Sequence, residues 1–121
     1  MAERRMFSKA VIDSDAFIDL PASARLLYYD LAMRADDDGF INSPKKIMRM
    51  VGCGETDLAA LISNGFVIYF KSGIVAIRHW KMQNYIQKDR YKATLYQDER
   101  KALDLQKNGA YIVVDLSKTQ E

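Results

Sequence analysis

The chain has 121 residues, a formal net charge of +2 and a single cysteine, Cys53. This length suits one domain with its own hydrophobic core, and a single cysteine excludes an internal disulfide. The sequence contains no secretory leader and no apolar run as long as a membrane span, so we expect a cytoplasmic protein without a membrane partner.

Two helical segments are expected in the first part of the chain. Residues 14–20 predict a short helical turn whose Phe17, Ile18 and Leu20 pack beneath the next helix. Residues 21–35 predict a longer helix, which Pro21 suits in its first turn. Its apolar residues recur at helical spacing, and they are Ala24, Leu27, Tyr28, Leu31 and Ala35.

A run of three acidic residues and a glycine, at positions 36–39, follows this helix. A calcium loop of the EF-hand type needs acids at alternating positions and a glutamate at the twelfth, which this run lacks. We therefore interpret it as a polar turn that leads into a short strand at residues 39–42.

Residues 43–65 predict two short helices joined by a turn. Ser43 and Pro44 suit the start of the first helix. The expected apolar side of that helix is Ile47, Met50 and Val51. Glycines at 52 and 54 permit a sharp turn, and a second helix over 55–64 ends at Gly65. Its inward residues are Leu58, Leu61 and Ile62.

A hairpin is predicted next, from β-branched and aromatic runs at 66–70 and 74–80 around the turn Lys71-Ser72-Gly73. The strand at 39–42 can pair with it to form a three-stranded sheet. Helix, turn, helix and hairpin is the chain order of a winged helix-turn-helix. We therefore expect an α+β fold: a winged helix-turn-helix with a small antiparallel sheet and a C-terminal helix and strand extension.

The remaining chain gives weaker signals. Residues 81–105 are polar, permit a helix and are rich in tyrosine and basic residues, so their form is left open. Residues 108–116 predict a strand that must pair with something. The expected organisation is a winged-helix DNA-binding domain over 1–92 and a C-terminal extension over 93–121, packed on or extending the same domain.

Positive charge is concentrated in the middle of the chain. Residues 39–92 hold nine Lys or Arg against three Asp or Glu, whereas acids outnumber bases on either side. Such a stripe suits a polyanion, because each cation near a phosphate releases condensed counterions. An ordinary solvated charged face is the alternative interpretation.

The second helix of the pair would normally enter the major groove of DNA, yet its outward side has no Lys or Arg, and arginine makes the commonest specific base contact. We therefore predict contacts mainly to phosphate. The expected DNA-binding residues are Lys45, Lys46, Arg49, Lys71, Arg78, Lys81, Lys88, Arg90 and Lys92, with Thr56, Ser63 and Asn64 as weaker candidates for the groove.

Aromatic residues alternate with the cations of residues 78–96. They are Trp80, Tyr85, Tyr91 and Tyr96. These rings can stack on unpaired bases while the cations follow the backbone. Packing of the rings back onto the domain is the alternative, and the commoner one for large amphipathic side chains.

No catalytic or metal-binding set stands out. The one histidine, His79, is placed in the second hairpin strand without a second histidine or a paired cysteine. The sequence also lacks a glycine-rich phosphate loop. We therefore expect a protein that is not an enzyme and that needs no cofactor or metal.

Two stretches go beyond such general patterns. They are "MFSKAVIDSDAFIDLPASARLLYYDLAMRADDDGFINSPKKIMRMVG" at 6–52 and "GIVAIRHWKMQNYIQKDRYKATLYQDE" at 73–99. Together they resemble the N-terminal winged-helix domain of replisome organiser proteins from phages and prophages of low-GC Gram-positive bacteria, which are similar to DnaD-type replication initiation proteins. The resemblance covers about residues 5–100.

This resemblance implies DNA binding at a replication origin, on duplex or partly opened DNA, and recruitment of a replicative helicase or its loader. Organisers of this kind usually continue into a further helical domain, whereas this sequence ends at Glu121. Either the chain is a small stand-alone member of the group, or a second domain is absent from it.

Two other functions remain open. A protein interaction or oligomerisation module would use the acid-flanked helix and the apolar C-terminal strand to dock on another copy or another replication protein. A winged-helix transcription regulator would need strong discrimination between DNA sites, which the absence of Lys and Arg on the second helix disfavours.

Overall fold

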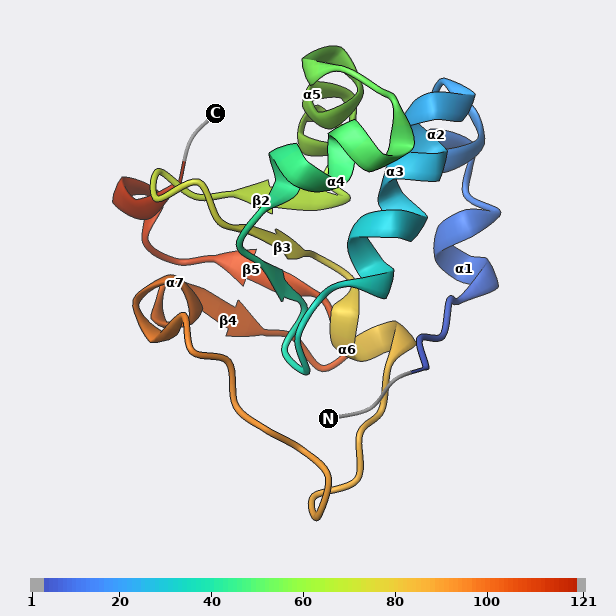
Figure 1. Cartoon of the computed structure of the whole chain (residues 1–121). Helices are drawn as coiled ribbons and strands as arrows, with labels where there is room; N and C mark the ends of the chain where they lie inside the picture. Colours follow the sequence, from blue (N-terminus) through green and yellow to red (C-terminus); the bar gives the residue numbers. More distant parts are fainter. Residues whose placement is uncertain (1–3, 120–121) are drawn as a thin grey trace.

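The computed structural model describes residues 4–119 and has a mixed α+β fold. Its first half is helical, with α1 (Lys9–Ile12), α2 (Asp15–Ile18), α3 (Ala22–Met33), α4 (Pro44–Val51) and α5 (Glu55–Ser63). In Figure 1 these helices occupy the upper and right-hand part of the molecule, and the strands lie below and to the left of them. Both α4 and α5 pack against α3.

Helix α3 confirms the prediction for residues 21–35, and its buried side forms the centre of the core. The ring of Tyr28 lies 5.2 Å from that of Phe17 and 6.0 Å from that of Phe66, edge to face in both cases. The hydroxyl of Tyr28 accepts a hydrogen bond from Gln83 Nε2 at 2.9 Å. Burial raises the pKa of Tyr28 to about 12.

The three-stranded sheet consists of β1 (Phe40–Ile41), β2 (Val67–Tyr69) and β3 (Val75–Ile77), in the order β1-β3-β2 with antiparallel neighbours. Its register pairs Ala76 with Phe40 on one side and with Ile68 on the other. The predicted pairing of residues 39–42 with the hairpin is therefore confirmed.

The second sheet has two strands, β4 (Leu103–Leu105) and β5 (Tyr111–Val113), and residues 116–118 form a short 3₁₀ helix. The strand predicted at 108–116 is therefore present as β5. Its partner, β4, lies within residues 81–105, for which the sequence predicted no definite structure. Helices α6 (Trp80–Gln83) and α7 (Gln97–Lys101) precede this sheet, and a long loop between them projects from the body of the molecule (Figure 1).

The two sheets are joined by polar and aromatic contacts. Tyr111 N donates to Arg78 O at 2.8 Å, and the Tyr111 hydroxyl donates to Asp38 O at 2.7 Å. The rings of Phe40 and Tyr111 lie 6.2 Å apart. Strand β5 is thereby held against the end of β3 and the turn before β1.

Two residues predicted to be inward are exposed. Met50 is 56 % exposed, because α4 packs on α3 through Ile47 and Met48 instead. Ile18 is 50 % exposed, since the one-turn helix α2 directs only Phe17 into the core. The predictions for Met50 and Ile18 were therefore wrong.

The second hairpin strand is also shorter than predicted. Strand β3 ends at Ile77, His79 lies in the following turn, and Trp80 begins α6. The indole of Trp80 is fully buried against Gly39, where a Cβ would lie only 2.6 Å from Trp80 Cγ. The chain leaves the strand at this point, and the large ring of Trp80 packs beneath the turn that precedes β1.

None of the helices within residues 4–119 combines the length and the apolar content needed to cross a membrane.

Candidate nucleic-acid interface

The acidic run at 36–38 is a buried anchor as well as the predicted turn. Asp38 is only 3 % exposed, and its carboxylate accepts hydrogen bonds from the Tyr91 hydroxyl at 2.8 and 2.7 Å and from Thr94 N at 2.8 Å. The ammonium of Lys81 lies 2.9 Å from the same carboxylate. One acidic side chain therefore holds a residue of α6 and two points of the segment between α6 and α7.

The ionisation of this pair follows from its contacts. Burial alone would raise the pKa of Asp38, but the hydrogen bonds from Tyr91 and Thr94 and the charge of Lys81 lower it below its ordinary value. Burial and the hydrogen bond to Asp38 raise the pKa of Tyr91 to about 12. Near neutral pH, Asp38 is a carboxylate and Tyr91 a neutral donor.

The other two acids of the run also turn inward. Asp37 is 1 % exposed, its carboxylate accepts from Lys92 N at 3.0 Å, and its backbone carbonyl accepts from Trp80 Nε1 at 2.9 Å. Asp36 accepts from the backbone N–H groups of Asp38 and Phe40, each at 3.0 Å. Both carboxylates are thereby held by backbone donors, and both side chains line a small groove together with Lys92.

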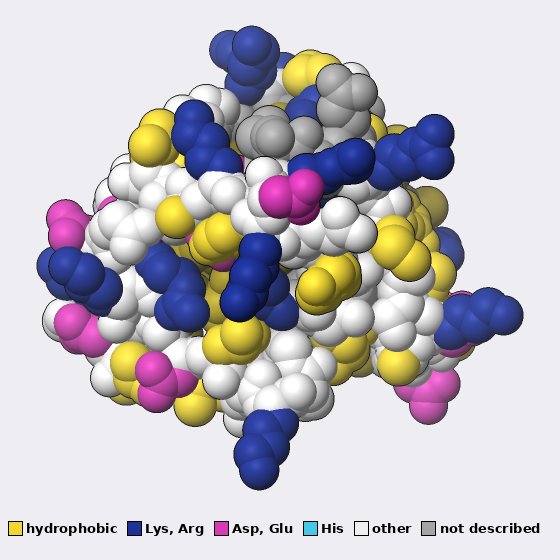
Figure 2. Space-filling view, turned by 90° about the horizontal axis from the view of Figure 1, so that it is seen from below, with side chains coloured by type: hydrophobic (Ala, Val, Ile, Leu, Met, Phe, Trp, Pro, Cys, Tyr) yellow, Lys and Arg dark blue, Asp and Glu magenta, His cyan; other side chains and the backbone are white. Residues whose placement is uncertain are grey.

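These contacts support an exposed loop at residues 85–93 that carries the cations Lys88, Arg90 and Lys92. The start of the loop is fixed where Asn84 Oδ1 accepts from Met6 N at 2.8 Å. Figure 2 shows the molecule from the side toward which the loop projects. On this face, Lys and Arg side chains outnumber Asp and Glu side chains and lie among hydrophobic ones. The loop therefore presents its cations to solvent on a fixed base.

Helix α4 provides the second group of exposed cations, Lys45, Lys46 and Arg49. Positions three and four apart lie on one side of a helix, so these residues share a face. A groove of about 390 Å³ connects the start of α4 with the β2–β3 loop, where Lys71 is exposed.

The two groups of cations border adjoining grooves. The groove beside α4 includes Asn42, and a smaller groove of about 200 Å³ includes both Asn42 and Lys92. Within residues 4–119, the exposed cations of these segments form no ion pair. We call this set the basic surface, and its members are Lys45, Lys46, Arg49, Lys71, Lys88, Arg90 and Lys92.

Arg78 and Lys81, also predicted to bind DNA, are engaged inside the molecule. Arg78 is half-buried and donates from Nη1 to Tyr111 O at 2.9 Å, and burial lowers its pKa. Lys81 pairs with Asp38, donates to Asp37 O at 3.3 Å and lies 4.8 Å from the ring centre of Tyr91. Their contact with DNA stays a prediction, and they are left out of the basic surface.

The weaker candidates lie on α5 and at its C-terminal end. Thr56 is exposed. Ser63 Oγ and Asn64 Nδ2 both donate to Ala60 O, at 3.3 and 2.8 Å, so their donors are directed to their own helix. Their role in groove contacts stays a prediction.

The four aromatic residues have different environments. Trp80 is fully buried, Tyr96 packs against the core, and Tyr91 is 41 % exposed with its hydroxyl held by Asp38. Tyr85 is 84 % exposed. Packing therefore accounts for three of the rings, and Tyr85 is the ring free to stack on a base.

The residues considered for catalysis or metal binding lie apart from the basic surface. His79 is half-buried, and burial and the charge of Arg78 lower its pKa, so it is neutral near pH 7. Within residues 4–119, no group of three or more His, Cys, Asp or Glu side chains is arranged to hold a metal ion.

One cation beside the basic surface was missed by sequence reasoning. Lys118 is exposed, and its carbonyl accepts from Lys71 N at 2.9 Å. Its position 47 residues after Lys71 gave no signal of this proximity.

Comparisons with protein-family models, curated proteins and solved structures found no match to this chain.

Proposed function

We propose that the protein binds DNA without catalysis, through phosphate contacts made by the basic surface. The observation that carries this proposal is a set of seven exposed cations that form no ion pair within residues 4–119, while Asp37 and Asp38 are buried. Of the nearby acids, Asp115 feels the charge of Lys71. Exposed cations that are not held in ion pairs are the groups that exchange counterions for phosphates.

The fold we propose for this function is a winged helix, with α3, α4 and α5 as its helices and the β2–β3 loop as its wing. The order α3, β1, α4, α5, β2, β3 supports this assignment. The nominal reading helix, α5, has acids in its first turn and no Lys or Arg. We therefore infer that α4, the wing and the 85–93 loop position the protein on the DNA backbone, and that base readout is minor.

The biological setting we propose is phage-type replication initiation, as in replisome organisers. The sequence resemblance supports this setting, and the basic surface is compatible with duplex or partly opened DNA. Recruitment of a helicase or its loader is part of the same proposal.

A salt titration tests the binding. Affinity for a DNA duplex and for a single strand would be measured by fluorescence anisotropy between low and moderate salt. Seven phosphate contacts predict that log affinity falls with log salt at a slope of about 6 on duplex and about 5 on a single strand. The DNA proposal fails if neither probe is bound at low salt.

The contribution of the loop is tested by changing Lys88, Arg90 and Lys92 together to Ala. We expect the slope on duplex to fall by about 3, because each lost phosphate contact removes about 0.9. A loss confined to the single strand would instead assign the loop to unpaired DNA. An unchanged slope on both probes would remove the loop from the interface.

A further inference from the structure

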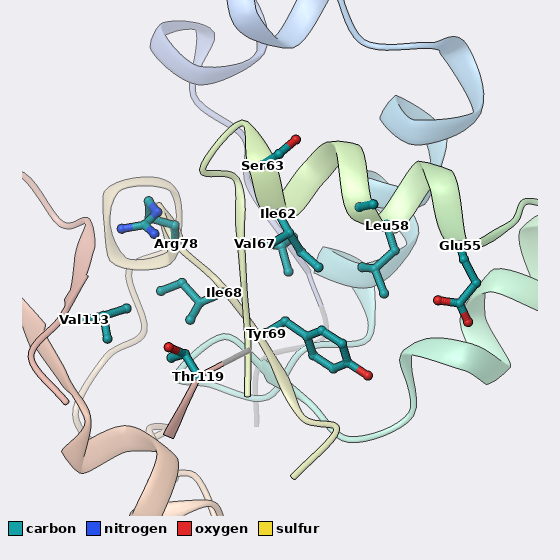
Figure 3. Close-up of a pocket in the computed structure, with 11 residues that line it drawn as sticks. Glu55, Leu58, Ile62, Ser63, Val67, Ile68, Tyr69, Arg78, Val113 and Thr119 are labelled. Atoms are coloured by element: carbon teal, nitrogen blue, oxygen red, sulfur yellow. The ribbon is translucent and has the colours of Figure 1, made fainter. Parts of the chain in front are cut away.

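A groove of about 600 Å³ lies between helix α5, strand β2 and strand β5 (Figure 3). Its volume falls within the roughly 300–1,000 Å³ that small-molecule sites occupy, and such sites combine apolar walls with a few polar groups that orient the ligand. Two charged side chains, Glu55 and Arg78, line the groove. Its apolar lining residues are Leu58, Ala59, Ile62, Val67, Ile68 and Val113.

The apolar lining has a closed base and more open sides. Leu58, Val67 and Ile68 are only 3, 1 and 4 % exposed, so the core holds them in place. Ile62 and Val113, by contrast, are half-buried. A ligand in the groove would therefore rest on side chains that are already ordered, and its contacts would be made with side chains and not with the backbone of β2.

Arg78 gives the groove a cation with unused donors. Its Nη1 donates to Tyr111 O at 2.9 Å, and its Nε is buried without an acceptor. Nη2 has no hydrogen-bond partner within residues 4–119, and no carboxylate of these residues lies within ion-pairing distance of the guanidinium. Because a guanidinium has five N–H donors and stays charged, Arg78 can receive a carboxylate at its Nη atoms.

Glu55 lies at the opposite end of the lining from Arg78 in Figure 3, and apolar side chains of α5 and β2 lie between them. Its carboxylate repels an anion, whereas Arg78 attracts one. A ligand with a single acidic group is therefore directed to the Arg78 end. A nucleic-acid strand, with a negative charge on every phosphate, does not suit this combination of an acid and apolar walls.

We propose that the groove binds a small amphipathic monocarboxylate, a molecule with an apolar body and one carboxylate. The apolar body lies on Leu58, Val67 and Ile68, and its removal from water stabilises the complex. The carboxylate accepts charge-assisted hydrogen bonds from the Nη atoms of Arg78, which fix the direction of the ligand. The site goes beyond DNA binding, since none of its lining residues belongs to the basic surface.

The test is a titration of the full chain with sodium octanoate, followed by NMR of methyl and amide groups. We expect saturable shifts at Leu58, Ile62 and Val113, with a dissociation constant below millimolar. The matched probe is 1-octanol, which has the same apolar body and no charge. It should bind at least about tenfold more weakly, because it brings no anion to Arg78.

Variants of the protein give the test its specificity. Arg78→Gln removes the cation and should lower the affinity for octanoate to that for octanol. Because Arg78 also holds Tyr111 O, a second variant, Ala59→Trp, leaves it in place and fills the groove from an exposed position of α5. This variant should lower octanoate affinity by about tenfold or more. Ala22→Trp makes the same change on exposed α3 and should leave the affinity unchanged.

Several results would overturn the proposal. One is the absence of saturable shifts at Leu58, Ile62 and Val113 up to millimolar octanoate, and another is equal affinity for octanoate and octanol. Wild-type affinity of Ala59→Trp would place the ligand elsewhere. The same shifts produced by a DNA oligonucleotide would assign the groove to nucleic acid, and shifts that rise with protein concentration alone would assign it to a second copy of the chain.

Discussion

The hydroxyl of Tyr91 lies 2.8 and 2.7 Å from the two carboxylate oxygens of Asp38, 53 positions earlier in the chain. This contact joins the turn after α3 to the exposed loop at 85–93. Because the same carboxylate holds Lys81 and Thr94 N, its removal affects more than the tyrosine. The placement of the loop cations therefore depends on an acid that does not itself face solvent.

Tyr91→Phe should lower the free energy of unfolding by about 1 kcal/mol, because it removes a hydrogen bond that a partly exposed tyrosine donates to a buried carboxylate with other donors. Asp38→Asn should cost more, about 2–3 kcal/mol, since it also leaves Lys81 without its acidic partner. Urea unfolding measures both values. Wild-type stability for Asp38→Asn would contradict the role of this carboxylate as an anchor.

The same pair sets a pH range for the anchor. The lowered pKa of Asp38 adds stability that is present above the ordinary aspartate pKa of about 4 and lost as pH falls through the folded value. The pKa of Tyr91, raised to about 12, adds stability that is present below about pH 10 and lost as pH rises toward 12.

The stability difference between wild type and Tyr91→Phe should therefore be constant from about pH 5 to pH 9 and shrink outside that range. Thermal unfolding across pH measures it. A difference that peaks near pH 7 and falls on both sides within this range would contradict the assignment.

Gly39→Ala should destabilise the fold strongly. Gly39 has φ +91°, and an added Cβ would lie 2.6 Å from Trp80 Cγ. Gly52 has φ +82° with open space around it, so Gly52→Ala reports the backbone cost alone, about 1–2 kcal/mol. We expect the loss of stability in Gly39→Ala to be larger than that in Gly52→Ala by ~1–3 kcal/mol, because the added methyl group overpacks the site. Equal costs in urea unfolding would show that Trp80 moves freely.

The start of α4 is tested by changing Lys45 and Lys46 together to Ala. We expect the slope of log affinity against log salt to fall by about 2 on duplex DNA. Lys9→Ala removes an exposed cation of α1, outside the basic surface, and should leave the slope unchanged. An effect of Lys9→Ala that is half that of the double variant, and so equal per charge removed, would indicate attraction by net charge alone.

Tyr85→Ala tests whether the exposed ring stacks on unpaired bases. We expect a loss of about 1–3 kcal/mol in single-strand affinity, with duplex affinity and thermal stability unchanged. Tyr96→Phe serves as a control for a ring packed on the domain. An equal loss on both DNA probes would indicate a contact to the backbone instead of a base.

The parts of the fold that sequence predicted are those set by local patterns. The helix at 22–33 and the hairpin follow from apolar spacing and turn glycines within a few residues. The choice between Met48 and Met50 was missed, because both are apolar and only the packing of α4 on α3 distinguishes them. Short elements with little periodicity depend on tertiary contacts.

The candidate site was also predicted only in part, because local composition indicates its cations but not their distant partners. The concentration of cations between residues 39 and 92 is readable from composition, and most of them are exposed. The internal engagement of Lys81 was not readable, because its partner Asp38 lies 43 positions earlier. The run at 36–38 looked like an ordinary polar turn, since nothing local indicated its distant donors.

The donors to the acidic turn have a consequence for any shortened form of the protein. Thr94 and Tyr111, both beyond residue 92, donate to Asp38. A fragment ending at residue 92 would lose these donors, expose carboxylates next to the basic residues and weaken DNA binding although it keeps every cation of the basic surface. The last quarter of the chain would then influence affinity for DNA from a distance, by holding the turn that carries Asp38 in its buried position.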